Sequence, residues 1–306
     1  MSRATSSLTA AGVTIDCERM RLPNNLLRVQ ASIIEGALTE MRSLEAGDIV
    51  NHDEGWQTGH YWLRDPELAP AAYQKAIRET IASVKAFAAG EFRGKYSNVL
   101  WIGIGGSGLG PQMLYDALRV PGKTPLMVFF DNTDPAGFDR ALADLAAKGG
   151  LQQTLAVVVS KSGGTKETRN GMLVAQQAYQ RAGLDYTKQF VAITREQSEL
   201  DRTAAKEGWL RRFPMWDWVG GRTSVMSAVG LLPASLAGFD VDQFLAGARE
   251  MDIATRSGDP ASNPAVLMAA AWHHLITQRG IHNLVVLPYC DSLTLDRKST
   301  RLNSSH

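Results

Sequence analysis

Short apolar runs alternate with longer amphipathic segments from about residue 70 of the chain onward. Buried strands are predicted at 98–103, 126–130, 154–159 and 189–194. Helices are predicted between them, including one from about 70 through 89 and one at 110–119. Strands that alternate with helices imply right-handed crossovers. The pattern therefore predicts an α/β fold with a doubly wound parallel sheet, in which ligands bind beyond the carboxyl ends of the strands.

Helical spacing predicts further helices on either side of this region, at 25–45, 225–232, 240–253 and 264–279. A last apolar run, 283–288, is predicted to be a buried strand that opens a second sheet. The segment 52–66 is rich in aromatic and charged residues. It is interpreted as a packed surface crossover in preference to a binding loop, because connecting loops outnumber sites.

Composition narrows the class of protein. The chain has 306 residues, and 44% hydrophobic content supports a sizeable core. Its 32 basic residues are balanced by 31 acidic ones, which excludes the broad positive field of a non-specific nucleic-acid binder. Cys17 and Cys290 have neither disulfide-framework nor zinc-ligand spacing. No signal peptide or membrane-length apolar run is found, so we expect a soluble cytoplasmic protein without a metal.

Two glycine-rich loops follow predicted strands about fifty residues apart. The first runs from Gly103 to Gly110, and the second runs from Ser160 to Thr165 as Ser-Lys-Ser-Gly-Gly-Thr. Glycines let backbone N–H groups approach an anion at a helix N-terminus. The pair of loops therefore indicates a site for a phosphorylated small molecule.

The first loop alone leaves a dinucleotide site open. Gly103, Gly105 and Gly108 satisfy the GxGxxG pattern, and Asp131 follows the next predicted strand as a ribose-binding acid would. This spacing does not distinguish a pyrophosphate from a sugar phosphate. The alternative it keeps open is an NAD-dependent dehydrogenase.

The second loop favours a phosphate monoester. It carries four side-chain donors within six residues, whereas an ordinary helix cap needs a single Ser or Thr. Arg222 follows two glycines and precedes a predicted helix, so its guanidinium either reaches the same mouth of the sheet or lies in solvent. His273 and His274 are adjacent on a helix and are interpreted as structural rather than as a metal pair.

Four segments together resemble the glucose-6-phosphate isomerase family, and the resemblance runs from about residue 50 to residue 290. They are Ile102–Pro111, Asp131–Pro135, Ser160–Thr168 and Val219–Ser224. The resemblance implies a homodimer with two sugar-isomerase αβα domains per subunit. The implied division is an N-terminal helical and crossover segment at 1–66 that packs on the second domain, a first domain at 67–235, and the start of a second domain at 236–295.

The resemblance also implies the reaction, which converts glucose 6-phosphate and fructose 6-phosphate through a cis-enediolate without metal or organic cofactor. The residues implied to hold the phosphate are Gly106, Ser107, Ser160, Lys161, Ser162 and Thr165. Arg222, with the backbone of Gly221, is implied to face the enediolate. A permanent cation there would stabilise charge that develops only in the transition state.

The family's carboxylate base, ring-opening histidine and C-terminal lysine have no counterpart in this sequence. The tail 296–306 has a single apolar residue, Leu302, and resembles a translated sequencing adapter, so it is expected to be non-native, and His306 is not assigned a catalytic role. We therefore expect this chain to be an inactive piece of the isomerase. The other alternative left open is a non-catalytic regulatory module that binds a sugar phosphate.

Overall fold

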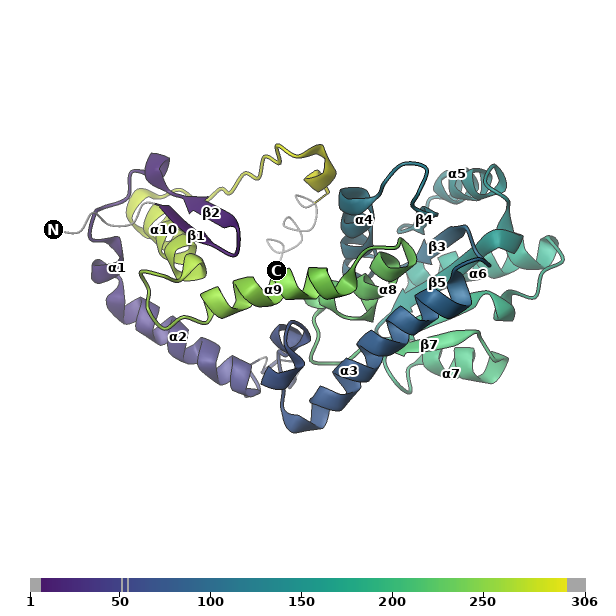
Figure 1. The fold of residues 1–306 in the computed structure, drawn as a ribbon, viewed down its shortest axis with the longest axis horizontal. Helices are drawn as coiled ribbons and strands as arrows, with labels where there is room; N and C mark the ends of the chain where they lie inside the picture. Colours follow the sequence, from purple (N-terminus) through teal and green to yellow (C-terminus); the bar gives the residue numbers. More distant parts are fainter. Residues whose placement is uncertain (1–6, 51, 54, 296–306) are drawn as a thin grey trace. The chain divides into compact units, whose positions relative to one another are not determined.

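The computed structural model describes residues 7–50, 52–53 and 55–295. It contains two compact units, one drawn from Met1–Pro70 and Asp242–Val286 and the other from Ala71–Val241 and Leu287–His306 (Figure 1). No helix within the described ranges has the length and apolar character needed to span a bilayer. The tail predicted to be non-native, 296–306, lies outside the described residues.

The second unit is built on a five-stranded parallel sheet (Figure 1). Its strands are β3 (Asn98–Ile102), β4 (Leu126–Phe130), β5 (Thr154–Ser160), β6 (Phe190–Thr194) and β7 (Arg211–Pro214). They lie in the order β4-β3-β5-β6-β7, so the doubly wound parallel sheet predicted from the alternation is confirmed. β7, a short edge strand with two arginines, was not among the predicted strands.

Helices cover both faces of this sheet. They are α3 (Ala71–Ala86), α4 (Gly106–Leu118), α5 (Pro135–Ala146), α6 (Lys166–Arg181), α7 (Glu199–Glu207) and α8 (Ala228–Leu236). Side chains of α5, α6 and α7 form one core with alternate strand residues such as Leu100, Ile102 and Val158. On the other face, α8 packs against both α3 and α4. β3, β5 and β6 are buried along their whole length, which explains their continuous apolar runs.

Helix α4 begins four residues before the predicted helix 110–119, inside the first glycine loop. Pro111 lies in its second turn, yet the helix continues to Leu118. A helix that starts at Gly106 turns the first amides of α4 toward the carboxyl edge of the sheet. The first loop is therefore shorter, and closer to the strand end, than the sequence indicated.

The first unit contains a hairpin and four helices. They are β1 (Ser7–Ala10), β2 (Val13–Asp16), α1 (Leu26–Val29), α2 (Ala31–Ala46), α9 (Val241–Thr255) and α10 (Pro264–Arg279). The predicted helix 25–45 is broken at Gln30, a buried side chain whose amide donates to the carbonyl of Ala270 at 3.0 Å. His273 contacts the same side chain, with 3.1 Å between its Nδ1 and Gln30 Oε1. The structural interpretation of that histidine fits this contact.

The strand predicted at 283–288 is wrong. Residues 281–288 have no regular secondary structure, and Leu284, Val285 and Leu287 expose 58%, 72% and 75% of their surface. An apolar run becomes a strand only when a neighbouring strand satisfies its backbone groups. No such neighbour is paired with this run among the described residues.

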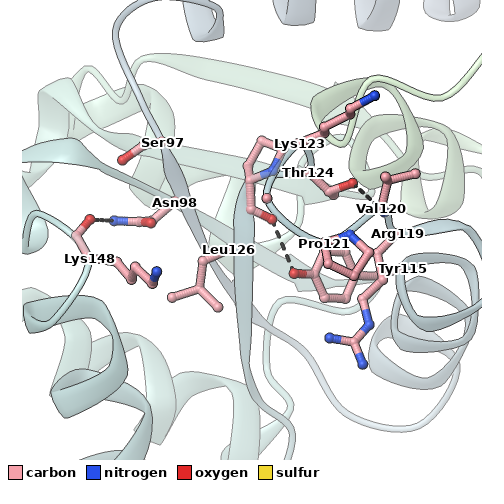
Figure 2. Close-up of a pocket in the computed structure, with 12 residues that line it drawn as sticks. Ser97, Asn98, Tyr115, Arg119, Val120, Pro121, Lys123, Thr124, Leu126 and Lys148 are labelled. Carbon is pink, nitrogen blue, oxygen red and sulfur yellow. Dashed lines mark hydrogen bonds between the residues drawn. The ribbon is translucent and has the colours of Figure 1, made fainter.

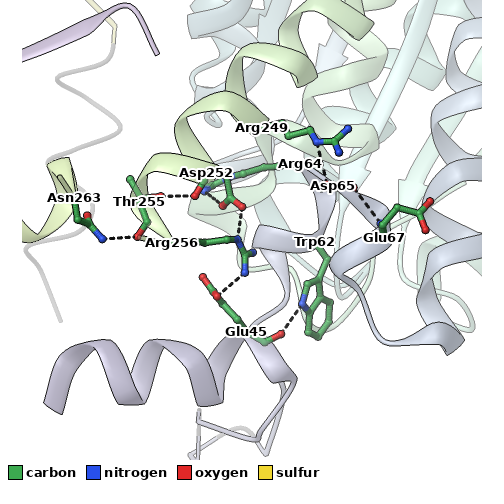
Figure 3. Close-up of polar contacts among 10 residues, drawn as sticks. All are labelled: Glu45, Trp62, Arg64, Asp65, Glu67, Arg249, Asp252, Thr255, Arg256 and Asn263. Carbon is green, nitrogen blue, oxygen red and sulfur yellow. Dashed lines mark hydrogen bonds and ion pairs between the residues drawn. The ribbon is translucent and has the colours of Figure 1, made fainter. Parts of the chain in front are cut away.

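An ion-pair network ties α2, the segment after it and α9 together within the first unit (Figure 3). Asp252 exposes 2% of its side chain and accepts from Arg64 at 2.7 Å and from Arg256 at 2.5 Å. Arg256 also pairs with Glu45 at 2.5 Å. Burial raises the pKa of Glu45 even though Arg256 lowers it. Asp252 is therefore the shared partner on which two largely buried arginines depend.

We expect Asp252→Asn to lower the free energy of unfolding of the first unit by about 2–4 kcal/mol, because it removes the ion pair of Arg64 and leaves Arg256 with Glu45 alone. Urea denaturation at neutral pH measures this change. Glu250→Gln is the matched control, since Glu250 lies exposed on the same helix. Equal stability of the two variants would contradict the role given to Asp252.

Candidate functional site

The two glycine loops lie side by side because the strands before them are neighbours. β3 and β5 pair in parallel, with Ile102 opposite Val158. From β3 the chain crosses to β4 on one side, and from β5 it proceeds to β6 and β7 on the other. The order of the sheet therefore reverses between β3 and β5, which is where open α/β sheets bind their ligands.

Backbone conformation fixes the first loop. Gly105 precedes α4 with φ 58° and ψ −127°, a backbone conformation that residues with a Cβ rarely adopt. The indole N–H of the buried Trp101 donates to the carbonyl of Ser107 at 2.7 Å and anchors the first turn of α4 to β3. The helix starts with no side-chain cap. The amides of Ser107 and Gly108 donate to the carbonyls of Ile104 and Gly105, so this helix end offers an anion the amide of Gly106 and the positive end of the helix dipole.

The second loop is folded around the hydroxyl of Ser160. This oxygen accepts from the amide of Gly163 at 3.1 Å and lies 3.2 Å from the hydroxyl oxygen of Thr165. The hydroxyl of Ser162 accepts from Gly164 at 3.2 Å. Thr165 occupies the N-cap position of α6, yet its side chain caps no amide of that helix. The loop is thus more than an ordinary helix cap. The N-terminus of α6 is a second uncapped helix end at the carboxyl edge of the sheet.

Lys161 connects the second loop to a third one. Its ammonium donates to the carbonyls of Asp217 and Val219, at 2.8 and 3.2 Å. These carbonyls belong to the segment that leads to Gly220, Gly221 and the 3₁₀ helix η7 (Gly221–Met226). The sequence suggested a phosphate ligand, and it gave no sign of this contact. The ammonium therefore braces the loop that carries Arg222, whatever else it binds.

The third loop, at 220–222, contacts the first loop through backbone atoms of two glycines. A Cβ on Gly106 would lie 2.1 Å from the carbonyl oxygen of Gly221, so no side chain fits at this position. Arg222 comes next, exposed, with no hydrogen bond or ion pair to any residue that the structure describes. The contact brings Arg222 into the neighbourhood of the first helix end. The three predicted elements of the site are thereby gathered at one edge of one unit.

Two of the three neighbouring carboxylates are engaged with other side chains. Asp131, the acid of the dinucleotide alternative, accepts from Gln112 of α4 at 2.8 Å and from Asn132 at 2.9 Å. Asp217 pairs with Arg195 at 3.4 Å. Glu199 lies near Gly164, since a Cβ on that glycine would be 3.8 Å from its carboxylate oxygen. With two helix N-termini, Lys161 and Arg222, the edge favours an anion over a ribose hydroxyl.

Three contributors to this geometry were missed from the sequence: Trp101, Gln112 and the backbone of Asp217. Trp101 lies within a predicted strand, and the sequence indicates only that it is a core residue. Gln112 is one polar residue on a helix. Their roles depend on long-range packing, so no local signal identifies them. No cluster of three or more His, Cys, Asp or Glu side chains suited to a metal occurs in the part of the chain that the structure covers.

Comparison with known proteins gives a consistent picture. The model of the family described as phosphoglucose isomerase matches residues 36–300. The chain is 53% identical over 293 residues to the glucose-6-phosphate isomerase of Geobacter sulfurreducens, covering 93% of this chain and 55% of the relative. It is 50% identical over 291 residues to that of Thermosynechococcus vestitus, covering 92% and 54%.

Solved structures agree with these matches. A crystal structure of a glucose-6-phosphate isomerase from Chlamydia trachomatis superposes with a TM-score of 0.86 at 28% identity, over 97% of this chain and 59% of that one. The chain thus spans about half the length of the curated relatives it matches.

The contact between Gly106 and Gly221 provides a first test of the site. We expect Gly106→Ala to displace η7 and to lower the free energy of unfolding by about 1–3 kcal/mol, because the new methyl group meets backbone that has no room to move. Gly247→Ala is the control, since a Cβ there meets nothing within 4 Å. Thermal unfolding of both variants measures the difference, and a fully stable Gly106→Ala protein would contradict the packing described.

The brace formed by Lys161 provides a second test. We expect Lys161→Met to speed hydrogen exchange of the amides at 217–222 by about tenfold in the ligand-free protein, because the loop loses the two hydrogen bonds that it accepts from this ammonium. Lys166→Met, at an exposed position in the first turn of α6, is the matched control. Unchanged exchange at 217–222 would show that the ammonium does not hold the loop.

Proposed function

Because the chain belongs to the phosphoglucose isomerase family, we propose that its three loops bind a hexose 6-phosphate as part of a glucose-6-phosphate isomerase. The reaction proposed is the reversible conversion of glucose 6-phosphate and fructose 6-phosphate through a cis-enediolate. The observation that carries the proposal is the meeting of two uncapped helix ends with a hydroxyl-rich loop and an unpaired arginine at the switch point of the sheet.

The phosphate is proposed to lie over the second loop. Ser160, Ser162 and Thr165 present hydroxyls there, and the first turn of α6 presents amides. Gly106 would add an amide, and Ser107 a hydroxyl, from the first turn of α4. Such groups suit a phosphate monoester, since each oxygen accepts several hydrogen bonds and the helix dipoles favour its charge. Lys161, whose ammonium is held by two carbonyls of the third loop, would contribute its positive charge.

Arg222 is proposed to stabilise the enediolate. The guanidinium follows Gly221 directly, and that glycine touches the first loop. With the phosphate held at one end, the sugar carbons extend toward the third loop. A fixed cation there lowers the barrier because its partner charge appears only in the transition state. Loss of one such donor typically costs about 10²- to 10³-fold in rate.

Proton transfer between C1 and C2 needs a base as well. Two of the carboxylates described beside the loops, Asp131 and Asp217, are already hydrogen bonded or ion paired, and the third, Glu199, lies beside Gly164 at the end proposed for the phosphate. We therefore expect the chain by itself to bind substrate without measurable turnover. The base, the ring-opening histidine and assembly as a homodimer are assigned to the complete protein, and a second sugar-isomerase domain from 236 onward stays a prediction.

The binding test compares ligands that share a sugar or a phosphate. We expect glucose 6-phosphate to stabilise the chain by about 2.7 kcal/mol at a hundred times its Kd, and glucose or NAD to have no effect. Thr165→Val should weaken the effect at least tenfold by removing one phosphate donor. Thr203→Val is the matched control, because Thr203 lies on α7 without a described partner. Calorimetry and thermal unfolding measure both quantities.

The alternatives give different outcomes. Stabilisation by NAD would support the dehydrogenase, and no response to any hexose phosphate would overturn the proposal. A regulatory module would bind the sugar phosphate yet stay inactive when residues 1–295 replace the matching part of the Geobacter sulfurreducens relative. We expect that chimera to isomerise fructose 6-phosphate, and Arg222→Ala within it to lose about 10²-fold or more in kcat.

A further inference from the structure

A cavity of about 480 Å³ opens at the other end of the sheet from the glycine loops (Figure 2). It is lined where β3 and β4 begin, at Asn98 and Leu126, and where the chain leaves the C-terminal end of α4. The glycine loops of the proposed isomerase site follow the last residues of β3 and of its parallel neighbour β5. The length of a five-residue strand, about 16 Å, therefore separates the two places.

The floor of this cavity is apolar and its margin is basic. Val120, Pro121, Pro125 and Leu126 line it together with the ring of Tyr115. Three cationic side chains also belong to its lining: Arg119, Lys123 and Lys148. The lining contains no acidic residue. Asp116 is the neighbouring carboxylate, 3.3 Å from the Arg119 guanidinium, and it offsets part of one charge.

The walls hold their shape through internal hydrogen bonds. The hydroxyl of Tyr115 donates to the carbonyl of Pro125 at 3.1 Å and accepts from the amide of Met127 at 3.2 Å. The amide of Val120 donates to the hydroxyl of Thr124 at 2.9 Å. Asn98 donates to the carbonyl of Lys148 at 2.8 Å, which fixes the backbone that carries this lysine. The cavity is therefore preformed rather than made by ligand binding.

The cationic groups in the lining of the cavity remain available to a ligand. The ammonium groups of Lys123 and Lys148 make no hydrogen bond or ion pair with any described residue. Figure 2 shows them on different sides of Leu126, with the guanidinium of Arg119 beyond Tyr115. Lysines that surround an apolar floor attract an anion, and the floor retains it only if the anion has an apolar part.

We propose that this cavity is a second ligand site, which takes an organic phosphate with an aromatic or apolar body, of the size of a nucleoside monophosphate. The volume lies within the range of small-molecule sites. The phosphate pairs with one of the flanking lysines, Lys123 or Lys148, and the body covers Leu126 and the two prolines. The proposal uses no residue of the glycine loops, so it stands independently of the isomerase assignment.

Titration calorimetry of the whole chain with AMP, adenosine and inorganic phosphate tests it. We expect AMP to bind at least tenfold more tightly than adenosine or inorganic phosphate. Its affinity should fall in 0.5 M salt. Lys123→Glu/Lys148→Glu should weaken AMP binding at least tenfold, with unchanged thermal unfolding because both lysines are exposed. The matched control, Lys166→Glu/Lys206→Glu, makes the same change of charge at exposed positions outside the lining and should leave binding intact.

Three results would overturn the proposal. One is no binding of AMP at millimolar concentration. Another is equal affinity for AMP and inorganic phosphate, which would mean that the apolar floor contributes nothing. The third is loss of AMP binding in Thr165→Val with retention in Lys123→Glu/Lys148→Glu, which would place AMP at the glycine loops.

Discussion

The proposed site depends on the contact between the backbones of Gly106 and Gly221. These residues are far apart in the chain, and the space between them admits no Cβ on Gly106. One belongs to the first turn of α4 and the other to the first residue of η7, so the contact joins the phosphate-type loop to the loop that carries Arg222. The ammonium of Lys161 secures the same loop from the side of β5. Three loops from three parts of the sequence thereby share one geometry.

The electrostatic character of this edge comes largely from backbone rather than from charged side chains. Two helices, α4 and α6, start at neighbouring strands without a side-chain cap. In contrast, α5 and α7 are capped by Asp134 and Ser198. An uncapped end leaves N–H groups for an anion, while a capped one does not. The chain therefore concentrates its positive helix ends where the sheet order reverses.

Local pattern predicted the parallel sheet because buried strands and amphipathic helices differ in period and length. It also placed both glycine loops at strand ends. It failed where the secondary structure of a segment depended on partners distant in the sequence. The run 283–288 has strand-like composition yet lacks a paired neighbour, and the helix expected at 25–45 is broken because Gln30 bonds to α10. The double contact of Lys161 was beyond sequence reasoning for the same reason, since it is made with backbone carbonyls that any residue type supplies.

The separation of Gly106 and Gly221 along the chain also bears on the order of folding. Closing a loop of more than a hundred residues costs chain entropy that must be offset by contacts formed first. The strands between them, β4 to β7, can pair with nearer neighbours before that closure. During synthesis, η7 emerges only after all five strands have been made. The contact between the first glycine loop and η7 therefore forms after the strands between them, although the loop itself is made before β4 to β7.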